Sequence, residues 1–280
     1  MRLIALRLTL IHAVLACAAA LIQPAFADGL DSVPELPVTI VKQLPHDARV
    51  FTQGMAIHGG VLIESSGIYG RSAIFTRTLD NTKPIDAKRT PKRWFAEGLA
   101  VHNNTVWLIT WREGIAQQLS LPALEPLSRW RYDGEGWGLT SDGDELVMSD
   151  GSEWLRWRTP TDFSVTRNLR VHAAGQPIKN INELEWVNGW ILANIWQSEW
   201  IIGIDPDTGG VAFKLSTRNL LTDSEQQRAN VANGIALDAS SGKLYISGKY
   251  WPKMFEIAVD LPSISDVQAL MKSAAGADSL

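Results

Sequence analysis

The chain has 280 residues, of which 45% are hydrophobic and 20% charged, and its formal net charge is −4. This is enough apolar material for a sizeable core, whereas the lack of any basic stripe or polybasic run argues against nucleic acid as a partner. Cys17 is the only cysteine, so core packing rather than disulfide bonds must hold the fold together.

Residues 1–27 have the pattern of a secretion signal. Two arginines near the start form a positive head, residues 8–21 are mostly apolar but short for a bilayer span, and Ala25-Phe26-Ala27 offers small residues where a signal peptidase cleaves. We therefore expect a periplasmic or secreted protein that has no membrane attachment after cleavage. A retained anchor helix and a lipoprotein attached through Cys17 are the alternatives.

Residues 28–36 are polar and contain a proline, and we expect them to form a loose leader. Residues 38–41 (Val-Thr-Ile-Val) then predict a strand that is broken off at Pro45. This strand has no hairpin partner of its own, so its partner must come from another part of the chain.

A four-residue phrase then recurs five times. The third residues of the five copies are Gly54, Gly98, Gly138, Glu183 and Gly234, which are 44, 40, 45 and 51 residues apart. Each copy is followed by a turn and an apolar strand, and a repeat of this length built from short strands is typical of a β-propeller blade. We therefore predict an all-β fold, a five-bladed β-propeller over residues 37–262, in which the N-terminal strand closes the last blade.

The second repeat shows the expected order of strands most clearly, because apolar and polar residues alternate with period two between turn residues. Its strands are expected at residues 98–101, 106–111, 116–119 and 128–132. The other repeats follow the same order, with Asn-Gly or Asp-Gly turns between apolar strands.

Two segments break the strand pattern and are expected to be helical. Residues 219–230 contain a capping signal, in which Thr222 caps the helix and Glu225 follows three positions later. Residues 264–274 predict a second helix within the C-terminal tail, residues 263–280.

Two sets of residues are expected at one face of the propeller. The position before the third residue of each phrase holds Gln53, Glu97, Trp137, Asn182 and Asn233. The ends of the second strands contribute Glu64, Trp111, Asp150, Asn194, Trp196 and Lys249. Because the first two strands of a blade are antiparallel, the start of one lies beside the end of the other. We therefore expect a pocket with aromatic walls, several amides, few acids and one lysine.

A purely structural role for these residues is the alternative. Glycine and aspartate in propellers often only turn the chain, and aromatic residues at blade ends often pack neighbouring blades. The residue before the repeated glycine, however, changes its identity from blade to blade, whereas a structural repeat position would tend to keep one residue type. The set as a whole therefore favours a binding or catalytic pocket.

Other chemistries find little support in the sequence. The histidines are far apart and do not have metal-ligand spacing. Neither a Gly-x-Ser-x-Gly elbow nor a glycine-rich phosphate loop is present. Residues 205–210 (Asp-Pro-Asp-Thr-Gly-Gly) are too short for a calcium loop and fit a hairpin turn better.

The repeated phrases and the segments around them resemble the glutaminyl-peptide cyclotransferases of the plant and bacterial type, which are five-bladed β-propellers. The matching segments run from residue 51 to 257 and include Phe51-Thr52-Gln53-Gly54, Phe95-Ala96-Glu97-Gly98-Leu99, Glu135-Gly136-Trp137-Gly138-Leu139, Ile181-Asn182-Glu183-Leu184-Glu185, Ala193-Asn194-Ile195-Trp196 and Gly248-Lys249-Tyr250-Trp251-Pro252. Two departures are visible: Ala100 stands where the family usually has threonine, and residues 115–127 differ from the family's more aromatic and acidic version.

The resemblance implies that an N-terminal glutamine is cyclised to pyroglutamate with release of ammonia. It implies catalytic roles for Glu97 and Lys249, with Glu97 taking a proton from the α-amine and returning it to the leaving nitrogen. The residues implied to bind substrate are Phe51, Gln53, Phe95, Trp111, Trp137, Asn182 and Trp196. The indole N–H groups of the three tryptophans are candidate donors to the negatively charged intermediate. Residues implied to lie along the channel or behind the pocket are Glu64, Asp150, Asn194 and Asn233.

The resemblance implies no cofactor and no catalytic metal, although a structural divalent cation in the channel is compatible with it. The expected partners are peptides or proteins with N-terminal glutamine, and the chain is expected to be a monomer.

Two functions of other classes stay open. A lactonase-type hydrolase would hold a divalent metal on the axis through Glu64, Glu97, Asp150, Asn182 and Asn233. A non-enzymatic binding propeller is the second, since a fold does not fix a function. A chelator would inhibit the hydrolase, and the binding propeller would release no ammonia from glutaminyl peptides.

Overall fold

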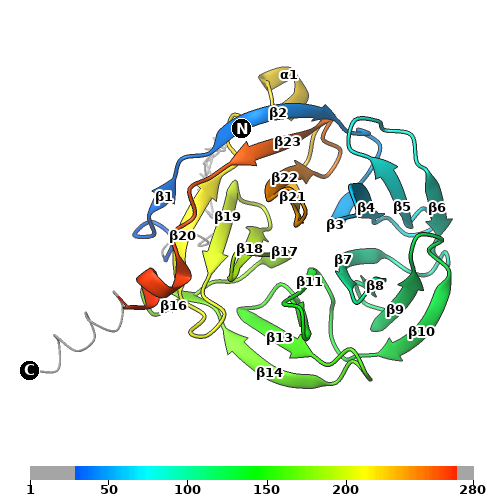
Figure 1. The fold of residues 1–280 in the computed structure, drawn as a ribbon, viewed down its shortest axis with the longest axis horizontal. Coiled ribbons are helices and arrows are strands. Elements are labelled where there is room, and N and C mark those ends of the chain that lie inside the picture. The colour runs from blue at the N-terminus through cyan, green and yellow to red at the C-terminus, as the bar shows by residue number, and fades with distance from the viewer. Residues whose placement is uncertain (1–28, 270–280) are drawn as a thin grey trace, which may run out of the picture.

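The computed structural model describes residues 29–269, which form five large sheets around a central axis (Figure 1) and one two-stranded sheet. Each large sheet is one blade built on four antiparallel strands, and the strand that comes first in each repeat lies innermost. The predicted all-β, five-bladed propeller is therefore confirmed. The predicted secretion signal, residues 1–27, and residues 270–280 of the tail lie outside the described residues.

The first three blades follow one another along the chain. Blade 1 consists of β3 (Thr52–His58), β4 (Val61–Ser66), β5 (Ala73–Thr78) and β6 (Asp86–Arg89). Blade 2 consists of β7 (Ala96–His102), β8 (Thr105–Thr110), β9 (Ile115–Ser120) and β10 (Pro126–Arg131). Blade 3 consists of β11 (Leu139–Ser141), β12 (Leu146–Met148), β13 (Trp154–Arg158) and β14 (Val165–Arg170). The innermost strands are buried and the outermost exposed, as a comparison of β7 with β10 shows.

Blades 4 and 5 each gain a strand from the N-terminal segment. Blade 4 consists of β17 (Ile181–Val187), β18 (Trp190–Ile195), β19 (Trp200–Ile204) and β20 (Val211–Ser216), with β1 (Glu35–Leu36) added in parallel to β20. Blade 5 consists of β21 (Ala232–Asp238), β22 (Lys243–Gly248), β23 (Lys253–Ala258) and β2 (Thr39–Pro45), which is antiparallel to β23. The predicted closure of the last blade by the N-terminal strand is thus confirmed (Figure 1). A short hairpin of β15 (His172–Ala173) and β16 (Gln176–Pro177) follows blade 3.

Buried polar contacts reinforce the joint between blades 5 and 1. His46, directly after β2, brings its Nε2 to 2.8 Å from Oε1 of Glu64 in β4, and its Nδ1 lies 2.6 Å from the carbonyl oxygen of Trp251. Burial alone would lower the pKa of His46, but the carboxylate of Glu64 holds it above its ordinary value. Nε of Arg77 lies 3.8 Å from the other oxygen of Glu64. These groups link the closing strand to blade 1.

The segment expected to be a loose leader is packed instead. Leu30 and Val33 are 2% and 6% exposed, and they belong to a hydrophobic cluster between blades 3 and 4. Nζ of Lys214 in β20 donates a 2.7 Å hydrogen bond to the carbonyl oxygen of Leu30. An isolated pair of apolar residues gives no periodic sequence signal, yet burying each side chain contributes about 1.5–3 kcal/mol. The leader expectation is therefore corrected for residues 29–36.

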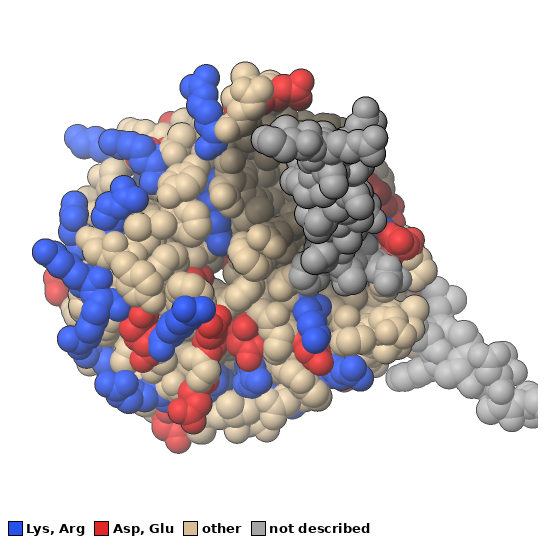
Figure 2. All heavy atoms as spheres, turned by 180° about the vertical axis from the view of Figure 1, so that it is seen from behind, with Lys and Arg blue, Asp and Glu red and all other residues tan. Residues whose placement is uncertain are grey.

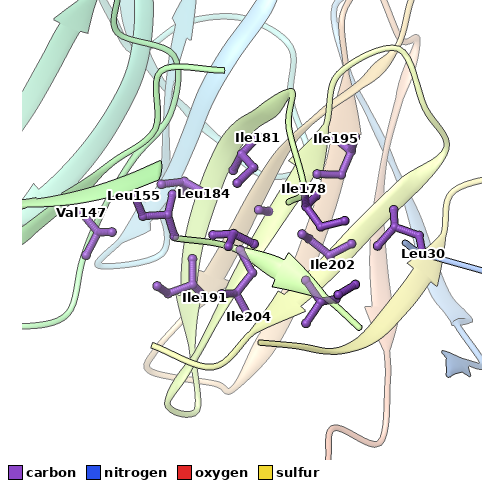
Figure 3. Packing of buried hydrophobic residues seen from close by; sticks show 14 of the residues in the cluster. Leu30, Val147, Leu155, Ile178, Ile181, Leu184, Ile191, Ile195, Ile202 and Ile204 are labelled. Atoms are coloured by element: carbon purple, nitrogen blue, oxygen red, sulfur yellow. The ribbon is translucent and has the colours of Figure 1, made fainter. Parts of the chain in front are cut away.

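The hydrophobic core is divided among the interfaces between adjacent blades. One cluster joins blades 3 and 4 and includes Val147, Leu155, Ile181 and Ile191 (Figure 3). Other clusters fill the remaining four interfaces. Every blade is therefore packed on both sides, which fixes the ends of the innermost strands relative to one another.

The repeated glycine allows the innermost strands to approach one another near the axis. A Cβ on Gly98 would lie 2.5 Å from the backbone nitrogen of Leu139 in the next blade, so any side chain there would force the strands apart. In blade 4 the same position is Glu183. Its carboxylate accepts hydrogen bonds from the backbone of Met55 at 3.3 Å and of Ile235 at 2.9 Å. One acidic side chain therefore ties blade 4 to blades 1 and 5.

The first predicted helix is confirmed as α1 (Asp223–Gln226), which begins with the predicted capping box of Thr222 and Glu225. Residues 264–269 are also helical, in agreement with the start of the second predicted helix, whose remainder lies outside the described residues. Within residues 29–269, no helix has the length and apolar character needed to cross a membrane.

Charged side chains cover outer edges of the blades. On the face seen in Figure 2, Lys and Arg gather mainly along one edge, with acidic residues among them lower down. The outermost strand β10 carries the exposed Arg129 and Arg131, and β14 carries the exposed Arg167 and Arg170. Charge on an unpaired strand edge disfavours pairing with another chain.

Candidate active site

A cavity of about 220 Å³ lies where the five blades meet. Its lining residues are Phe51, Gln53, Phe95, Glu97, Trp111, Trp137, Asn182, Trp196 and Lys249. All nine are among the residues singled out from the sequence, and each blade contributes at least one. The structure therefore brings together every residue that was expected to bind substrate or to act catalytically, although their positions alone do not assign their roles.

Glu97 is the acid of the cavity. It is 5% exposed, and its Oε1 accepts a 2.8 Å hydrogen bond from Nε2 of Gln53. Its main-chain carbonyl oxygen accepts a 2.6 Å bond from Oγ of Ser65, which fixes the backbone beneath the carboxyl group. Burial raises the pKa of Glu97 well above its ordinary value, Lys249 opposes this, and the charges of Glu135 and Glu113 add to it. The result is a carboxyl group that holds a proton more tightly than a carboxyl group in water does.

Lys249 is the basic residue that lines the cavity, and it follows directly after β22. It is 4% exposed, and its Nζ lies 4.9 Å from the centroid of the Phe51 ring. Burial lowers the pKa of Lys249 to about 8, while the carboxyl group of Glu97 opposes the shift. An acid with a raised pKa and an amine with a lowered pKa in one cavity are a common arrangement in sites of proton transfer.

Asn182 offers unused hydrogen-bonding capacity to the cavity. It is 2% exposed, and its Oδ1 has no partner in the described part of the chain. Its main chain is fixed, because its carbonyl oxygen accepts a 2.6 Å bond from Oγ of Ser149. A buried amide oxygen without a partner is costly unless a ligand or water satisfies it, so this atom points to a polar ligand.

Aromatic rings form the walls of the cavity. Trp137 and Trp196 meet edge to face with their centroids 5.6 Å apart, and Phe95 meets Trp111 in the same way at 5.5 Å. Such pairs contribute about 0.5–1.5 kcal/mol beyond the area they bury. The walls are therefore held by one another as well as by the strands that carry them.

Two of the indoles differ from the sequence expectation. Nε1 of Trp111 and Nε1 of Trp137 donate to the same oxygen, Oε2 of Glu135, at 2.7 and 3.0 Å. These two N–H groups, which were candidate donors to a reaction intermediate, are therefore already used by a carboxylate in this structure. Among residues 29–269, Nε1 of Trp196 has no hydrogen-bond partner, so it remains available as a donor.

The residues expected along the channel or behind the cavity form hydrogen bonds, some to a neighbouring blade and some within their own blade. Glu64 binds His46, and Asp150 binds Ser152 and Arg156 within blade 3. Asn194 accepts a 3.0 Å bond from the backbone of Gly234.

Asn233 contacts a residue of the cavity lining directly. Its Nδ2 lies 3.3 Å from Oε1 of Gln53 and donates at 3.0 Å to the carbonyl oxygen of Thr52. Among the residues that the lactonase alternative requires, the three carboxyl groups are used in separate contacts, by Glu64, Glu97 and Asp150. The amide oxygens of Asn182 and Asn233 have no partner among residues 29–269. Within residues 29–269, no three His, Cys, Asp or Glu side chains form a cluster suited to a metal ion.

Sequence reasoning missed two acids near the cavity. Glu135 binds two wall tryptophans, as described above, and Glu113 accepts from the backbone of Phe95 at 3.1 Å and from the hydroxyl of Tyr69 at 2.9 Å. Glu135 stands two residues before Trp137, and Glu113 stands two after Trp111. Their nearness to the predicted tryptophans was the available signal.

The fold and the site define a class: a five-bladed propeller that encloses a buried carboxyl group, a buried amine and an aromatic wall at the meeting point of its blades. Residues 9–259 match the family model described as glutamine cyclotransferase. The chain belongs to this family, and the resemblance found in the sequence is confirmed.

Two relatives extend this match. The chain is 32% identical over 226 residues to the glutaminyl-peptide cyclotransferase of Arabidopsis thaliana. The aligned region covers 79% of this chain and 70% of that protein. It is also similar to the crystal structure of Myxococcus xanthus glutaminyl cyclase, with a TM-score of 0.74 and 34% identity over 82% of this chain and 99% of that one.

Proposed function

We propose that this protein is a glutaminyl-peptide cyclotransferase in which Glu97 acts as general acid and base. It would convert the N-terminal glutamine of peptides or proteins to pyroglutamate and release ammonia. The family and the names of both relatives support this activity, which belongs to the acyltransferases. The observation that carries the proposal is the buried carboxyl group of Glu97, which shares one small cavity with Lys249 and Asn182.

The reaction needs no second substrate. The α-amino nitrogen attacks Cδ of its own side-chain amide, so a carbon–nitrogen bond forms and closes a five-membered ring. The carbonyl oxygen carries the negative charge of the intermediate until the bond from Cδ to the amide nitrogen breaks. One proton leaves the amine and one reaches the departing nitrogen, which leaves as ammonia.

Glu97 can serve both proton transfers. A free α-amine has a pKa of roughly 7.7–8.0, and burial raises the pKa of Glu97 well above its ordinary value. A carboxyl group that binds its proton more tightly than usual is a better acceptor for the proton of the amine. In the described residues only Oε1 of Glu97 has a hydrogen-bond partner, so Oε2 is the atom that would carry the proton.

Other residues of the cavity would hold the substrate and its developing charge. The Lys249 ammonium and Nε1 of Trp196 are the candidate donors to the amide oxygen, since the other two indoles bind Glu135. Oδ1 of Asn182, which has no protein partner, would accept from the α-amine. The aromatic walls would confine the glutamine to the ring-forming rotamer, an orientation effect that can supply several kcal/mol of the barrier.

The cavity volume limits recognition to one residue. About 220 Å³ accommodates a glutamine but not the peptide that follows it, so we expect the rest of the substrate to remain outside. If residues 1–27 act as a secretion signal, the enzyme would meet exported peptides in the periplasm or outside the cell, and we expect it to act there as a monomer.

Ammonia release from Gln-Gln and from Gln-2-naphthylamide, with and without EDTA, tests the proposal. We expect ammonia from both substrates in the presence of EDTA, and none from the variant Glu97→Gln. Strong inhibition by EDTA would favour a metal-dependent hydrolase, and no ammonia from the wild-type protein would favour a binding propeller. Full turnover by Glu97→Gln would remove the acid–base assignment while leaving the cyclase activity in place.

A further inference from the structure

One carboxylate outside the cavity lining connects two of its walls. Oε2 of Glu135 accepts hydrogen bonds from Nε1 of Trp111 at 2.7 Å and from Nε1 of Trp137 at 3.0 Å. Its other oxygen accepts from Nε of Arg112 at 2.9 Å. Trp111 follows the last residue of β8 in blade 2, and Trp137 precedes β11 in blade 3, so the contact crosses the boundary between two blades.

We propose that Glu135 is a positioning residue for the cyclisation, which holds Trp111 and Trp137 at a fixed orientation and separation around the substrate glutamine. This inference rests on the proposed function of the cavity. Hydrogen bonds to an ionised acceptor are roughly twice as strong as those between neutral groups. One oxygen shared by two indoles therefore acts as a clamp between the two blades.

The surroundings of both rings show why the clamp is needed. The ring of Trp137 packs against Gly151, where a Cβ would lie 2.6 Å from its Cζ2, and against the edge of Trp196. These apolar contacts limit the plane of the ring, but they offer no partner to its N–H group. The carboxylate supplies that partner and so selects one orientation of the indole.

Trp111 is held in a similar way. The guanidinium carbon of Arg112 lies 3.8 Å from the centroid of the Trp111 ring. The same guanidinium also donates a hydrogen bond to Glu135. Arg112, Trp111 and Glu135 thus form one connected unit at the rim of the cavity. A wall displaced by about 1 Å can cost around 10²-fold in turnover, because ring closure depends on the orientation of the amine and the amide.

Glu135 also acts on the cavity through its charge. Burial raises the pKa of Glu135, but the hydrogen bonds from Trp137, Trp111 and Arg112 bring it below its ordinary value, so the carboxylate stays ionised near neutral pH. That negative charge is one of the causes that raise the pKa of Glu97. Removal of the Glu135 charge should therefore lower the pKa of Glu97, which is a readout separate from the hydrogen bonds to the indoles.

Two variants separate the clamp from the charge. Glu135→Gln keeps an acceptor oxygen for the indoles, so we expect kcat within about tenfold of wild type. It removes the negative charge that raises the pKa of Glu97, so we expect the acidic limb of kcat/KM to move to lower pH. Glu135→Ala removes both, so we expect kcat/KM for Gln-Gln to fall about 10²-fold, with an increase in KM. Glu125→Gln, at an exposed acid that pairs with Lys88, is the matched control and should change neither quantity.

The indole ¹⁵N–¹H resonances provide a measurement that does not depend on turnover. We expect the Trp111 and Trp137 signals to shift in Glu135→Ala, and to shift less in Glu135→Gln. Unchanged indole signals in both variants would overturn the proposed clamp, whatever their activity. If the wild-type protein releases ammonia, a wild-type kcat/KM together with an unchanged pH profile in both variants would also overturn it. If Glu135→Ala does not fold, the indole signals and the acidic limb of kcat/KM in Glu135→Gln test the proposal by themselves. Absence of ammonia from the wild-type protein would instead reject the proposed function.

Discussion

Nε2 of Gln53 donates a 2.8 Å hydrogen bond to Oε1 of Glu97, and the two residues occupy equivalent positions in neighbouring repeats. The amide of Gln53 is itself fixed from blade 5, because Nδ2 of Asn233 lies 3.3 Å from its Oε1. Three blades therefore determine the direction of one carboxyl group. Since Oε1 accepts from Gln53, a proton on Glu97 must reside on Oε2.

Replacing Gln53 with alanine should release this carboxyl group. We expect kcat for ammonia release from Gln-Gln to fall about 10²-fold in Gln53→Ala, because the proton carried by Glu97 would no longer be held in line with the substrate. Asn233→Ala removes a contact one step further away, so its loss should be smaller. A Gln53→Ala enzyme with the wild-type kcat would show that Glu97 is oriented by other contacts.

The pH dependence of kcat should report Lys249 at its alkaline side. The pKa of Lys249 is lowered to about 8 by burial, so the ammonium loses its charge above that pH and can no longer stabilise the intermediate. Since kcat reflects ionisations of the enzyme–substrate complex, we expect kcat to fall near pH 8. At the acidic side, the raised pKa of Glu97 should place the limb above the usual range of a carboxyl group.

Lys249→Arg and Lys249→Met distinguish the charge from the titration. An arginine stays charged at all working pH values, so Lys249→Arg should lose the alkaline limb of kcat even if its maximum is lower. Lys249→Met removes the donor, and we expect kcat to fall about 10²–10³-fold. An alkaline limb that is the same in wild type and Lys249→Arg would assign it to another group.

The repeat explains how much of the site can be predicted from the sequence. Trp111, Trp196 and Lys249 each stand one position after the second strand of a blade, and all three face the cavity. Glu64 and Asn194 lie inside their strands instead, and their side chains turn to neighbouring blades. A spacing of 40 to 51 residues defines the blade, but a shift of one or two positions decides whether a side chain faces the cavity or an interface.

The structure shows contacts that no repeat position encodes. Glu135 lies in a loop before β11, and its value to the site depends on two indoles that approach from different blades. The packing of Leu30 and Val33 between blades 3 and 4 depends likewise on a surface assembled from distant segments. Local pattern predicted the strands and the ring, whereas such contacts between distant segments require the assembled fold.

Glu185 offers a test of the fold that is independent of catalysis. Its Oε1 accepts a 2.7 Å hydrogen bond from the backbone of Leu237 in blade 5, and its Oε2 lies 3.4 Å from Oγ1 of Thr140 in blade 3. Burial raises the pKa of Glu185 from 4.5 to about 8. Between these two values the unfolded chain releases the proton while the folded protein keeps it, so stability falls as pH rises through this window.

The isosteric variant Glu185→Gln should therefore become relatively more stable as pH rises. A tenfold difference in proton affinity between the folded and unfolded states corresponds to about 1.4 kcal/mol. Because Glu185 keeps partial contact with solvent, we expect a gain on the order of 2–4 kcal/mol at pH 9. At pH 4 the carboxyl group is largely protonated in both states, so the two proteins should unfold alike.

Urea unfolding of both proteins at pH 4, 6.5 and 9 measures the difference, with the exposed Glu125→Gln as control. A stability difference that does not change with pH would mean that Glu185 is ionised in the folded protein, with the hydrogen bond from Leu237 compensating for its burial.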